Sequence, residues 1–499
     1  MIDMGATGKS AKRISHVHMI GVCGVAMGSL AGMLKARGYS VTGSDEHVYP
    51  PMSDMLGGWG IPVIQGYDPA HVGTPDLVVI GNAVSRGNPE AEHVLNARIP
   101  YRSMAQALFE FFLEDREVIA VAGTHGKTTT TALLAHILET AGLSPSYFVG
   151  GVPGNTNSNF GLGAGKYFVI EGDEYDSAFF EKVPKFMVYR PSHLVLTSLE
   201  FDHADIYRDL DEIMLWFRRL VNIVPSAGRI VRSAKYETLA RATERSLAQV
   251  ARYGAGEGEF AYRFTGFDGD RARITLSTPA GELECDTLLF GDFNFQNIAA
   301  AASMALLLGV GADDVRRGIS TFLGVRRRQE LIYSKGPIRI YEDFAHHPTA
   351  IAGVLAMMRE RFPVARLHAV YEPRSATSRR NVFQDELPGA FAAADAVYIK
   401  SPFKLDGIPE SERIDIGRAI AAMHARGMDA AEYPSVDGIL DSLFVRMDGD
   451  ADHVVLVMSN GGFDGIYRKM IARAQARFGG DSLEGANSNP RLQGRHTSR

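Results

Sequence analysis

Residues 120–135 read AVAGTHGKTTTTALLA, and this stretch constrains the fold more than any other. An apolar strand runs into a glycine turn and then a helix-forming segment, the context that a phosphate-binding loop requires. The ending Gly126-Lys127-Thr128 matches a Walker A loop, but Val121 stands where that motif has its first glycine. We predict a variant phosphate loop rather than a plain glycine turn with a solvated lysine, with Lys127 at the β- and γ-phosphates and Thr128 on Mg²⁺. The residues predicted to bind ATP here are Gly123, Thr124, His125, Gly126, Lys127, Thr128 and Thr129.

Strands and helices alternate on both sides of this loop. HVHMIGVCGVAMGSLAGMLKARGYSVTGSD predicts strand, glycine turn, helix and strand, and IRIYEDFAHHP, ARLHAVYEPRS, DAVYIKSP and HVVLVMSNGG predict four strands with polar ends. This alternation indicates α/β units with parallel sheets, which bind ligands at the carboxyl ends of their strands. We predict domains at residues 1–115, 116–323 and 324–480, with residues 1–15 flexible and residues 481–499 a disordered tail.

The composition is that of an ordinary globular protein, with 45% hydrophobic and 22% charged residues among 499. A net charge of -6 argues against general nucleic-acid binding, and no apolar run is long enough to span a membrane. The chain has only two cysteines, Cys23 and Cys285, and its start lacks the apolar core of a signal peptide. We therefore expect a cytoplasmic protein without a disulfide framework.

Two strand ends after the phosphate loop carry candidate Mg²⁺ ligands. Glu171 directly follows the apolar run KYFVI, and His203 lies in LTSLEFDHADIY after another strand. Carboxylate oxygen suits Mg²⁺ well, and a neutral imidazole can also bind it. Singly, each residue has a plainer explanation, as an exposed acid or as a helix-cap partner. Their place at two strand ends favours a metal site with Thr128.

A second glycine loop lies near the N-terminus. GVCGVAMG places Gly21, Gly24 and Gly28 between a strand and a helix, a spacing that differs from the dinucleotide fingerprint G-x-G-x-x-G. Amides at such a helix start can hold a diphosphate, and Ser44 and Asp45 of the next strand's GSD turn could meet a ribose or uracil. A purely structural turn is about equally compatible with this spacing, and an NAD site is a weaker alternative.

Taken together, the motifs resemble those of the Mur ligases, ATP-dependent amide ligases that build the peptide of bacterial peptidoglycan. GTHGKTTT, EGDE, FDHADIY, GDFNFQNIAAAA, GVRRRQE and YEDFAHHPTA occur in the family's order, over roughly residues 15–475. The shifted glycine is the family's form of the phosphate loop, shared with folylpolyglutamate synthases. The resemblance implies an α/β fold of three domains: a Rossmann-like UDP-binding domain, a P-loop ATPase domain and a Rossmann-like C-terminal domain.

The substrate follows from a finer resemblance. The first glycine loop and GSD resemble the branch that binds UDP-N-acetylmuramate, which adds either free L-alanine or the preformed tripeptide L-Ala-γ-D-Glu-meso-diaminopimelate. EHVYPPMS, IGNAVSRGNPE, GGVPGN, YEPRSAT and MSNGGFDGIYRKM are similar to the tripeptide-adding members, which act in peptidoglycan recycling. L-alanine addition is the alternative, and the identity of the tripeptide's third residue rests on the resemblance alone.

The resemblance also implies roles for further residues. Asn294 and Asn297 would contact adenine, Arg328 the γ-phosphate and Asp343 the ATP ribose. Lys127, Glu171, His203 and Arg328 would be the catalytic set. The residues implied in substrate binding are Gly21, Gly24, Gly28, Ser44, Asp45, Asn82, Ser85, His347, Arg374, Ser375, Ser459 and Asn460. For His347, which precedes Pro348 in a turn, a purely structural role is equally compatible with the sequence.

Two positions depart from the family pattern. Phe293 replaces the histidine of the adenine motif, so one adenine contact is lost while that of Asn294 is kept. The helix DEIMLWFRRLVNIVP has no lysine where several relatives carry a carbamylated one. The second Mg²⁺ would then rest on Glu171, His203 and substrate phosphate.

Two other classes remain as alternatives: a simple kinase or NTPase, against which the first domain argues, and a non-catalytic binding protein, against which the intact loop argues. The oligomeric state stays open.

Overall fold

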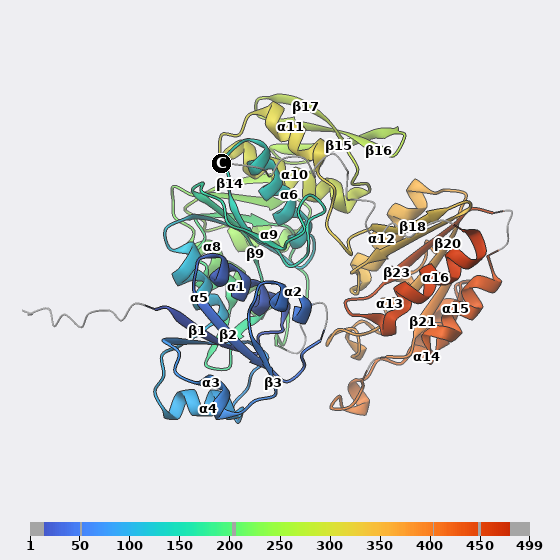
Figure 1. Ribbon diagram of the computed structural model, residues 1–499. Coiled ribbons are helices and arrows are strands. Elements are labelled where there is room, and N and C mark those ends of the chain that lie inside the picture. The colour runs from blue at the N-terminus through green and yellow to red at the C-terminus, as the bar shows by residue number, and fades with distance from the viewer. Residues whose placement is uncertain (1–13, 50–51, 202–205, 403, 448–450, 480–499) are drawn as a thin grey trace, which may run out of the picture.

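The computed structural model describes residues 14–49, 52–201, 206–402, 404–447 and 451–479. Three main sheets with helices around them follow one another along the chain, as Figure 1 shows. The third unit stands beside the other two, which lie against each other. The predicted tail and most of the predicted flexible start lie outside the described residues. The α/β class and the three-domain arrangement are confirmed, while the exact domain boundaries stay predictions.

The first sheet is entirely parallel, with strand order β3-β2-β1-β4-β5. The order reverses between β1 and β4, and the carboxyl ends of such neighbouring strands form the usual ligand crevice of an open α/β sheet. Gly21 follows β1 and Asn82 follows β4, so both lie at this crevice. The strands are β1 His16–Ile20, β2 Ser40–Asp45, β3 Val63–Gln65, β4 Leu77–Ile80 and β5 Tyr101–Ser103, and the helices between them are α1 Val25–Ala36, α2 Met52–Gly58, α3 Pro69–Val72 and α4 Pro89–Asn96.

The second sheet has ten strands in the order β17-β16-β15-β14-β13-β12-β6-β9-β7-β8. Its centre is β6, which carries the phosphate loop and pairs in parallel with β9 on one side and β12 on the other. Glu171 ends β9, and Glu200 follows β12, so three neighbouring strand ends bring their polar residues to one edge. The strands are β6 Glu117–Ala122, β7 Ser146–Phe148, β8 Phe160–Gly161, β9 Tyr167–Gly172, β12 His193–Leu196, β13 Arg229–Ser233, β14 Gln249–Ala255, β15 Phe260–Asp268, β16 Arg271–Thr278 and β17 Gly281–Thr287. The strands β16 and β17 pair antiparallel.

Helices cover this sheet on both faces. The phosphate loop runs into α6 Lys127–Thr140, beside α10 Asp292–Leu307 and α11 Ala312–Thr321. The other helices of this region are α7 Lys185–Val188, α8 Leu210–Ile223 and α9 Glu237–Thr243. The segment between the first and second sheets forms α5 Met104–Leu108 and a π-helix over Phe109–Leu113. A small antiparallel pair, β10 Asp176–Ala178 and β11 Glu181–Pro184, stands outside the main sheet.

The third sheet has six strands, two more than the sequence predicted. Its order is β18-β19-β23-β20-β21-β22, and only β18 is antiparallel to its neighbour. The two unpredicted strands are β18 and β22, which form its edges. Both carry charged residues and lack the long apolar run of the inner strands, so the sequence signal is weak. The strands are β18 Glu330–Lys335, β19 Ile338–Asp343, β20 Arg366–Tyr371, β21 Ala396–Lys400, β22 Asp429–Tyr433 and β23 His453–Met458, and the helices are α12 Pro348–Arg361, α13 Leu387–Ala390, α14 Ile416–His424, α15 Val436–Val445 and α16 Ile466–Phe478.

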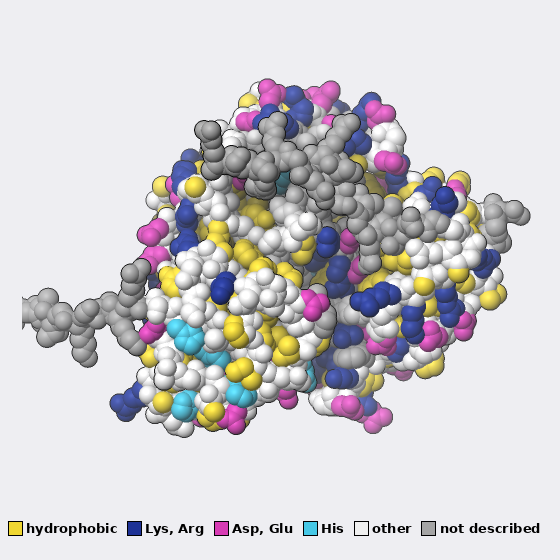
Figure 2. Space-filling model, in the orientation of Figure 1, with side chains coloured by type: hydrophobic (Ala, Val, Ile, Leu, Met, Phe, Trp, Pro, Cys, Tyr) yellow, Lys and Arg dark blue, Asp and Glu magenta, His cyan; other side chains and the backbone are white. Residues whose placement is uncertain are grey.

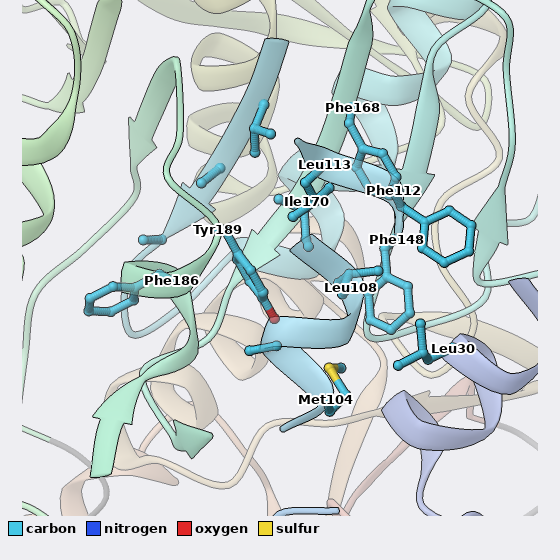
Figure 3. Close-up of a cluster of buried hydrophobic side chains, with 14 of the residues drawn as sticks. Leu30, Met104, Leu108, Phe112, Leu113, Phe148, Phe168, Ile170, Phe186 and Tyr189 are labelled. Carbon is cyan, nitrogen blue, oxygen red and sulfur yellow. The ribbon is translucent and has the colours of Figure 1, made fainter. Parts of the chain in front are cut away.

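The first two domains share one hydrophobic core. A continuous cluster of buried side chains includes Leu30 of α1, Leu108 of α5 and Phe168 of β9. Figure 3 shows Leu30 and Met104 facing Phe148, with Phe168 farther along the same cluster. Burial of apolar surface stabilises the folded state by about 25 cal/mol per Å². The shared core therefore fixes the position of the first domain relative to the second.

The third domain docks on α10 through close packing. A β-carbon at Gly353 of α12 would lie 2.0 Å from the ring of Phe293, and one at Gly291 would lie 1.8 Å from the sulfur of Met357. These two glycines therefore permit an approach that a larger residue blocks. Phe293, the residue that departs from the family's adenine motif, is thus also an interdomain contact. Figure 2 shows Lys and Arg side chains gathered along the hollow between the third domain and the rest.

Candidate functional site

A cavity of about 370 Å³ lies where the three domains meet. The first domain contributes Ala26 and Met104, the second contributes the phosphate loop and Glu171, and the third contributes the loop after β19. The predicted ATP-site residues that line the cavity are Thr124, His125, Gly126, Lys127, Thr128, Thr129, Asn294, Asn297, Arg328 and Asp343. The fold therefore brings together residues that are more than 200 positions apart in the chain.

The phosphate loop has the backbone shape that its glycines allow. Gly126 precedes α6 with a φ of 81°, and Gly123 has a φ of 138°, values that favour glycine. The amides at the start of α6 form an anion-binding helix terminus. The Lys127 ammonium donates to the carbonyl of Gly123 at 2.6 Å and to Glu174 at 3.0 Å. Burial opposes the charge of Lys127, but Glu174 and Asp173 outweigh it and raise the pKa of the lysine.

The segment after β12 supports this loop from behind. The Thr197 hydroxyl donates to the carbonyl of His125 at 2.5 Å, and the His125 amide donates to the Ser198 hydroxyl at 2.8 Å. The amide of Glu200 donates to the Thr124 hydroxyl at 2.9 Å, while its carboxylate lies 2.8 Å from Nε2 of His125. These hydrogen bonds therefore fix the shape of the loop.

Glu171 suits a cation. The amide of Gly150 donates to its Oε2 at 3.0 Å, while Oε1 is buried and has no hydrogen-bond partner among the described residues. Burial raises the pKa of Glu171, although Thr128 and Lys127 act in the opposite direction. A buried carboxylate oxygen without a partner is costly unless a ligand satisfies it. Glu171 and the Thr128 hydroxyl therefore fit Mg²⁺, whereas the predicted ligand His203 lies outside the described residues.

Arg328 points from the third domain's first segment into the cavity. One of its guanidinium nitrogens lies 3.4 Å from the Thr128 hydroxyl, and the group stacks over Phe344 at 4.6 Å. Its neighbours Arg327 and Gln329 both have positive φ, a conformation that non-glycine residues rarely adopt. Such strain needs support from the surrounding structure. The side chain of Arg327 provides part of it by donating to the carbonyl of Gly461 at 2.7 Å. Arg327 and Arg328 thus have different environments, and Arg328 is not a surface charge.

The predicted adenine and ribose residues form a connected network. Asn294 donates to the Gln329 side chain at 2.9 Å, and Asn297 donates to Asn294 at 3.3 Å. Asp343 ends β19 and accepts the amides of Gln329 at 2.9 Å and Ala345 at 2.7 Å. Burial raises the pKa of Asp343, while Arg328 opposes the shift. Each carboxylate oxygen of Asp343 thus accepts one backbone amide and keeps a lone pair that can accept a hydrogen bond from a ribose hydroxyl.

In the first domain, the glycine loop is held by Asp45. Its carboxylate accepts the amide of Cys23 at 2.8 Å and that of His47 at 3.0 Å. The predicted contact Ser44 is buried and donates to Glu90, so its side chain lies behind the loop. Gly28 lies inside α1, where a β-carbon would stand 2.2 Å from the sulfur of Met52, which indicates a packing role.

Several other residues predicted to bind substrate lie at the ligand crevice of the first sheet. Gly24 caps the start of α1, and Asn82 is half-buried after β4. Ser85 is exposed on the same loop. Together with Gly21, these residues stay candidates for contact with a nucleotide sugar.

In the third domain, the predicted peptide loops lie side by side. They follow β20 and β23, which pair in parallel. The Ser459 hydroxyl is buried and donates to Glu372 at 2.6 Å, and Arg374 lies 3.5 Å from the same carboxylate. Oδ1 of Asn460 is buried and has no hydrogen-bond partner among the described residues. A β-carbon at Gly461 would lie 2.1 Å from the side chain of Arg374. Glycine at this position therefore leaves room for the arginine to pass over the loop.

Two predicted residues of this region have local roles. The Ser375 hydroxyl donates to that of Ser378 at 2.8 Å. His347 caps α12, with its Nδ1 accepting the amide of Thr349 at 3.2 Å, and its ring also lines the cavity.

Sequence reasoning missed four acidic residues that orient the site. Glu174 pairs with Lys127, Glu200 with His125, Glu372 with Ser459 and Arg374, and Glu90 with Ser44. All four lie inside motifs quoted above, namely EGDE, LTSLEFDHADIY, YEPRSAT and IGNAVSRGNPE. The sequence shows these acids, but apart from Arg374 their partners are distant in the chain, so the motifs do not reveal which residues they contact.

Comparison with known proteins agrees with this architecture. Family models described as Mur ligase family, catalytic domain; Mur ligase middle domain; and Mur ligase, glutamate ligase domain match residues 16–116, 121–305 and 327–461. A relative in Escherichia coli K12, UDP-N-acetylmuramate–L-alanyl-γ-D-glutamyl-meso-2,6-diaminoheptandioate ligase, is 41% identical over 458 residues, covering 91% of this chain and 97% of the relative. The UDP-N-acetylmuramate–L-alanine ligase of Rubrobacter xylanophilus is 35% identical over 401 residues, with 79% and 86% covered.

A solved structure is also similar. The crystal structure of a murein peptide ligase from Psychrobacter arcticus 273-4 has a TM-score of 0.69 and 34% identity, covering 92% of this chain and 98% of that one. The chain belongs to the Mur ligase family, and it is an ATP-dependent ligase that forms amide bonds. Among the described residues, no helix is both long enough and apolar enough to cross a membrane.

Proposed function

We propose that the protein joins L-Ala-γ-D-Glu-meso-diaminopimelate to UDP-N-acetylmuramate with ATP, in the recycling of cell-wall peptides. The main support is the 41% identity over 97% of the Escherichia coli ligase whose name carries this tripeptide. The L-alanine ligase of Rubrobacter xylanophilus is less similar, with 35% identity over 86% of its length. Arg374 and Asn460, on adjoining loops of the third domain, offer donors for a substrate richer in carboxylates than alanine.

The proposed chemistry activates a carboxylate. The lactyl carboxylate of UDP-N-acetylmuramate attacks the γ-phosphate of ATP, giving an acyl phosphate and ADP. The free α-amine of the tripeptide's alanine then attacks the acyl carbon, and phosphate leaves as the amide forms. Because a carboxylate is a poor acyl donor, the phosphoryl group supplies the leaving group. The protein's contribution is positioning and neutralisation of charge.

The residues around the cavity have proposed roles in both steps. Lys127 and Arg328 would neutralise charge on the transferred phosphoryl group, and the amides of the phosphate loop would hold the other phosphates. Thr128 and Glu171 would hold Mg²⁺, which when bound screens the negative charge between phosphates. Asn294 and Asp343 would fix the adenosine, and the loops around Gly21 and Asn82 the uridine diphosphate. His203 stays a prediction as a further metal ligand.

The test is phosphate release by the purified protein with ATP, Mg²⁺ and UDP-N-acetylmuramate. One sample receives the tripeptide, a second L-alanine and a third neither amine. We expect release only with the tripeptide, together with a product whose mass equals that of the amide. Release with L-alanine alone would replace this proposal by the alanine-adding function, and release in the third sample would indicate an ATPase or kinase.

A substitution at Arg374 tests whether the third-domain loops bind the amine substrate. Arg374→Ala removes the guanidinium, and we expect the KM for the tripeptide to rise by about tenfold or more, since charged hydrogen bonds contribute about 1.5–3 kcal/mol. The KM for UDP-N-acetylmuramate should stay nearly constant. Equal rises of both constants would point to a general loss of structure instead.

A further inference from the structure

Two imidazoles and a carboxylate converge beside the phosphate loop. They are His125 of that loop, Glu200 after β12 and His347 at the start of α12. One ligand atom from each residue lies within 4.8 Å of the other two, and Nε2 of His125 is 2.8 Å from Oε2 of Glu200. The two rings have their centroids 4.9 Å apart. The sequence motifs assign His125 to the ATP site and His347 to substrate binding, but the catalytic steps proposed above use none of these three side chains.

We propose that these three side chains form a binding site for a transition-metal cation of the Zn²⁺ class. Two imidazoles with one glutamate are a donor set that Zn²⁺ accepts in three-ligand sites that keep a fourth position open. Mg²⁺ prefers oxygen ligands, so this set selects against the ion proposed for Thr128 and Glu171. His125 and His347 both line the cavity, which leaves the fourth position to water or to a ligand oxygen.

The geometry requires only small movements. Bonds of about 2.0–2.2 Å to a tetrahedral ion put neighbouring donor atoms about 3.4 Å apart. His125 and Glu200 must therefore separate by roughly 0.6 Å from their 2.8 Å contact, while His347 moves toward them. The cation takes the place of the proton that joins Nε2 of His125 to the Glu200 carboxylate.

The surroundings hold His125 and Glu200 in place, whereas His347 must give up one hydrogen bond. The backbone of His125 is bonded to Thr197 and Ser198, and that of Glu200 to Thr124. His347 is fixed by the start of α12, where its Nδ1 accepts the amide of Thr349 at 3.2 Å. If Nε2 of His347 takes the cation, the ring proton moves to Nδ1 and this cap bond is released. The site therefore binds less tightly than a fully prearranged one.

The donors come from two domains, which gives the site a structural consequence. His125 and Glu200 belong to the second sheet's edge, and His347 belongs to the third domain. A cation bound by all three joins the phosphate loop to the third domain. Zn²⁺ should therefore stabilise the docked arrangement of the domains as well as bind.

The experiment uses the full chain without nucleotide and titrates Zn²⁺ against a chromogenic chelator. Three variants keep the local hydrogen bonds but remove a donor: His125→Gln, Glu200→Gln, and His347→Asn, which can still cap α12. We expect one tight Zn²⁺ equivalent for the wild type and at least about tenfold weaker binding for each variant, since even indirect disturbance of metal ligands costs 10–100-fold. Zn²⁺ should also raise the melting temperature of the wild type but not of His347→Asn.

Two controls make the result specific. His203→Ala and Glu171→Gln remove residues of the predicted Mg²⁺ site, and both should retain the tight Zn²⁺ equivalent. Co²⁺ bound to the wild type should show visible d–d absorption that the His125→Gln variant lacks. The proposal is overturned if the wild type binds Zn²⁺ no more tightly than the three variants. It is equally overturned if His203→Ala or Glu171→Gln, rather than these variants, abolishes the tight equivalent.

Discussion

At the scale of single residues, the phosphate loop depends on one lysine held by acids. The Lys127 ammonium lies 3.0 Å from Glu174, which holds it at the loop. We expect Lys127→Ala to abolish ATP-dependent ligation while the circular dichroism spectrum stays near that of the wild type. Lys166→Ala is a matched control, because that lysine forms an exposed pair with Glu117. Ligation by Lys127→Ala at a near-normal rate would refute the role given to the loop.

The two cysteines allow a prediction about reactivity. Burial and the nearby Asp45 raise the pKa of Cys23 to about 11, and burial raises that of Cys285 to about 12. A raised pKa keeps each group a neutral thiol at all pH values well below these figures, and the thiolate is the reactive form. We expect both thiols to react slowly with a disulfide reagent at pH 7 in the native protein. Both should react quickly after unfolding in denaturant, which serves as the control. A native thiol that reacts at pH 7 as fast as the unfolded one would contradict this.

At the scale of elements, the docking of α12 on α10 requires a glycine at position 353, because glycine has no side chain. A β-carbon at Gly353 would lie 2.0 Å from the Phe293 ring, so Gly353→Ala must push the two helices apart. Overpacking of this kind costs about 1–3 kcal/mol, and we expect kcat to fall by about tenfold. Gly57→Ala, in an open position on α2, should leave kcat unchanged.

A double variant tests the cause of that loss. Phe293→Leu shortens the opposing side chain, so its combination with Gly353→Ala should recover part of the lost rate. Simple addition of the two single effects would show that the contact is not what limits the Gly353→Ala variant.

At the scale of the whole molecule, the first two domains form one unit and the third another. Leu108 and Phe112 belong to the segment after the first sheet, yet they pack with Phe168 and Ile170 of the second. A fragment of residues 1–115 would expose this surface to water. We expect it to aggregate or to melt without cooperativity, whereas residues 1–323 should melt in a sharp transition and bind UDP-N-acetylmuramate. Sharp melting of residues 1–115 alone would show that the shared core is dispensable.

Much of the fold was predictable because its signals are local. Apolar runs of strand length, glycine turns and helix-forming segments lie within a few residues of one another, so the α/β class follows from the sequence. The edge strands β18 and β22 were missed since their alternating or charged residues resemble loop sequence. The same local signals identified Gly126, Lys127 and Thr128, because a phosphate loop is a contiguous motif.

What the sequence determined by itself is therefore the class of fold, the phosphate loop and the polar residues at strand ends. The tertiary structure decided which of those residues meet. The pairing of β6 with β9 and β12 places Glu171 and Glu200 beside the loop, and docking of the third domain brings Arg328 to Thr128 across 200 positions. Such contacts depend on strand order and domain packing, which arise from many weak interactions distributed over the chain. No short stretch encodes them, so only the folded molecule reveals that Ser44 lies behind its loop and that His125, Glu200 and His347 converge.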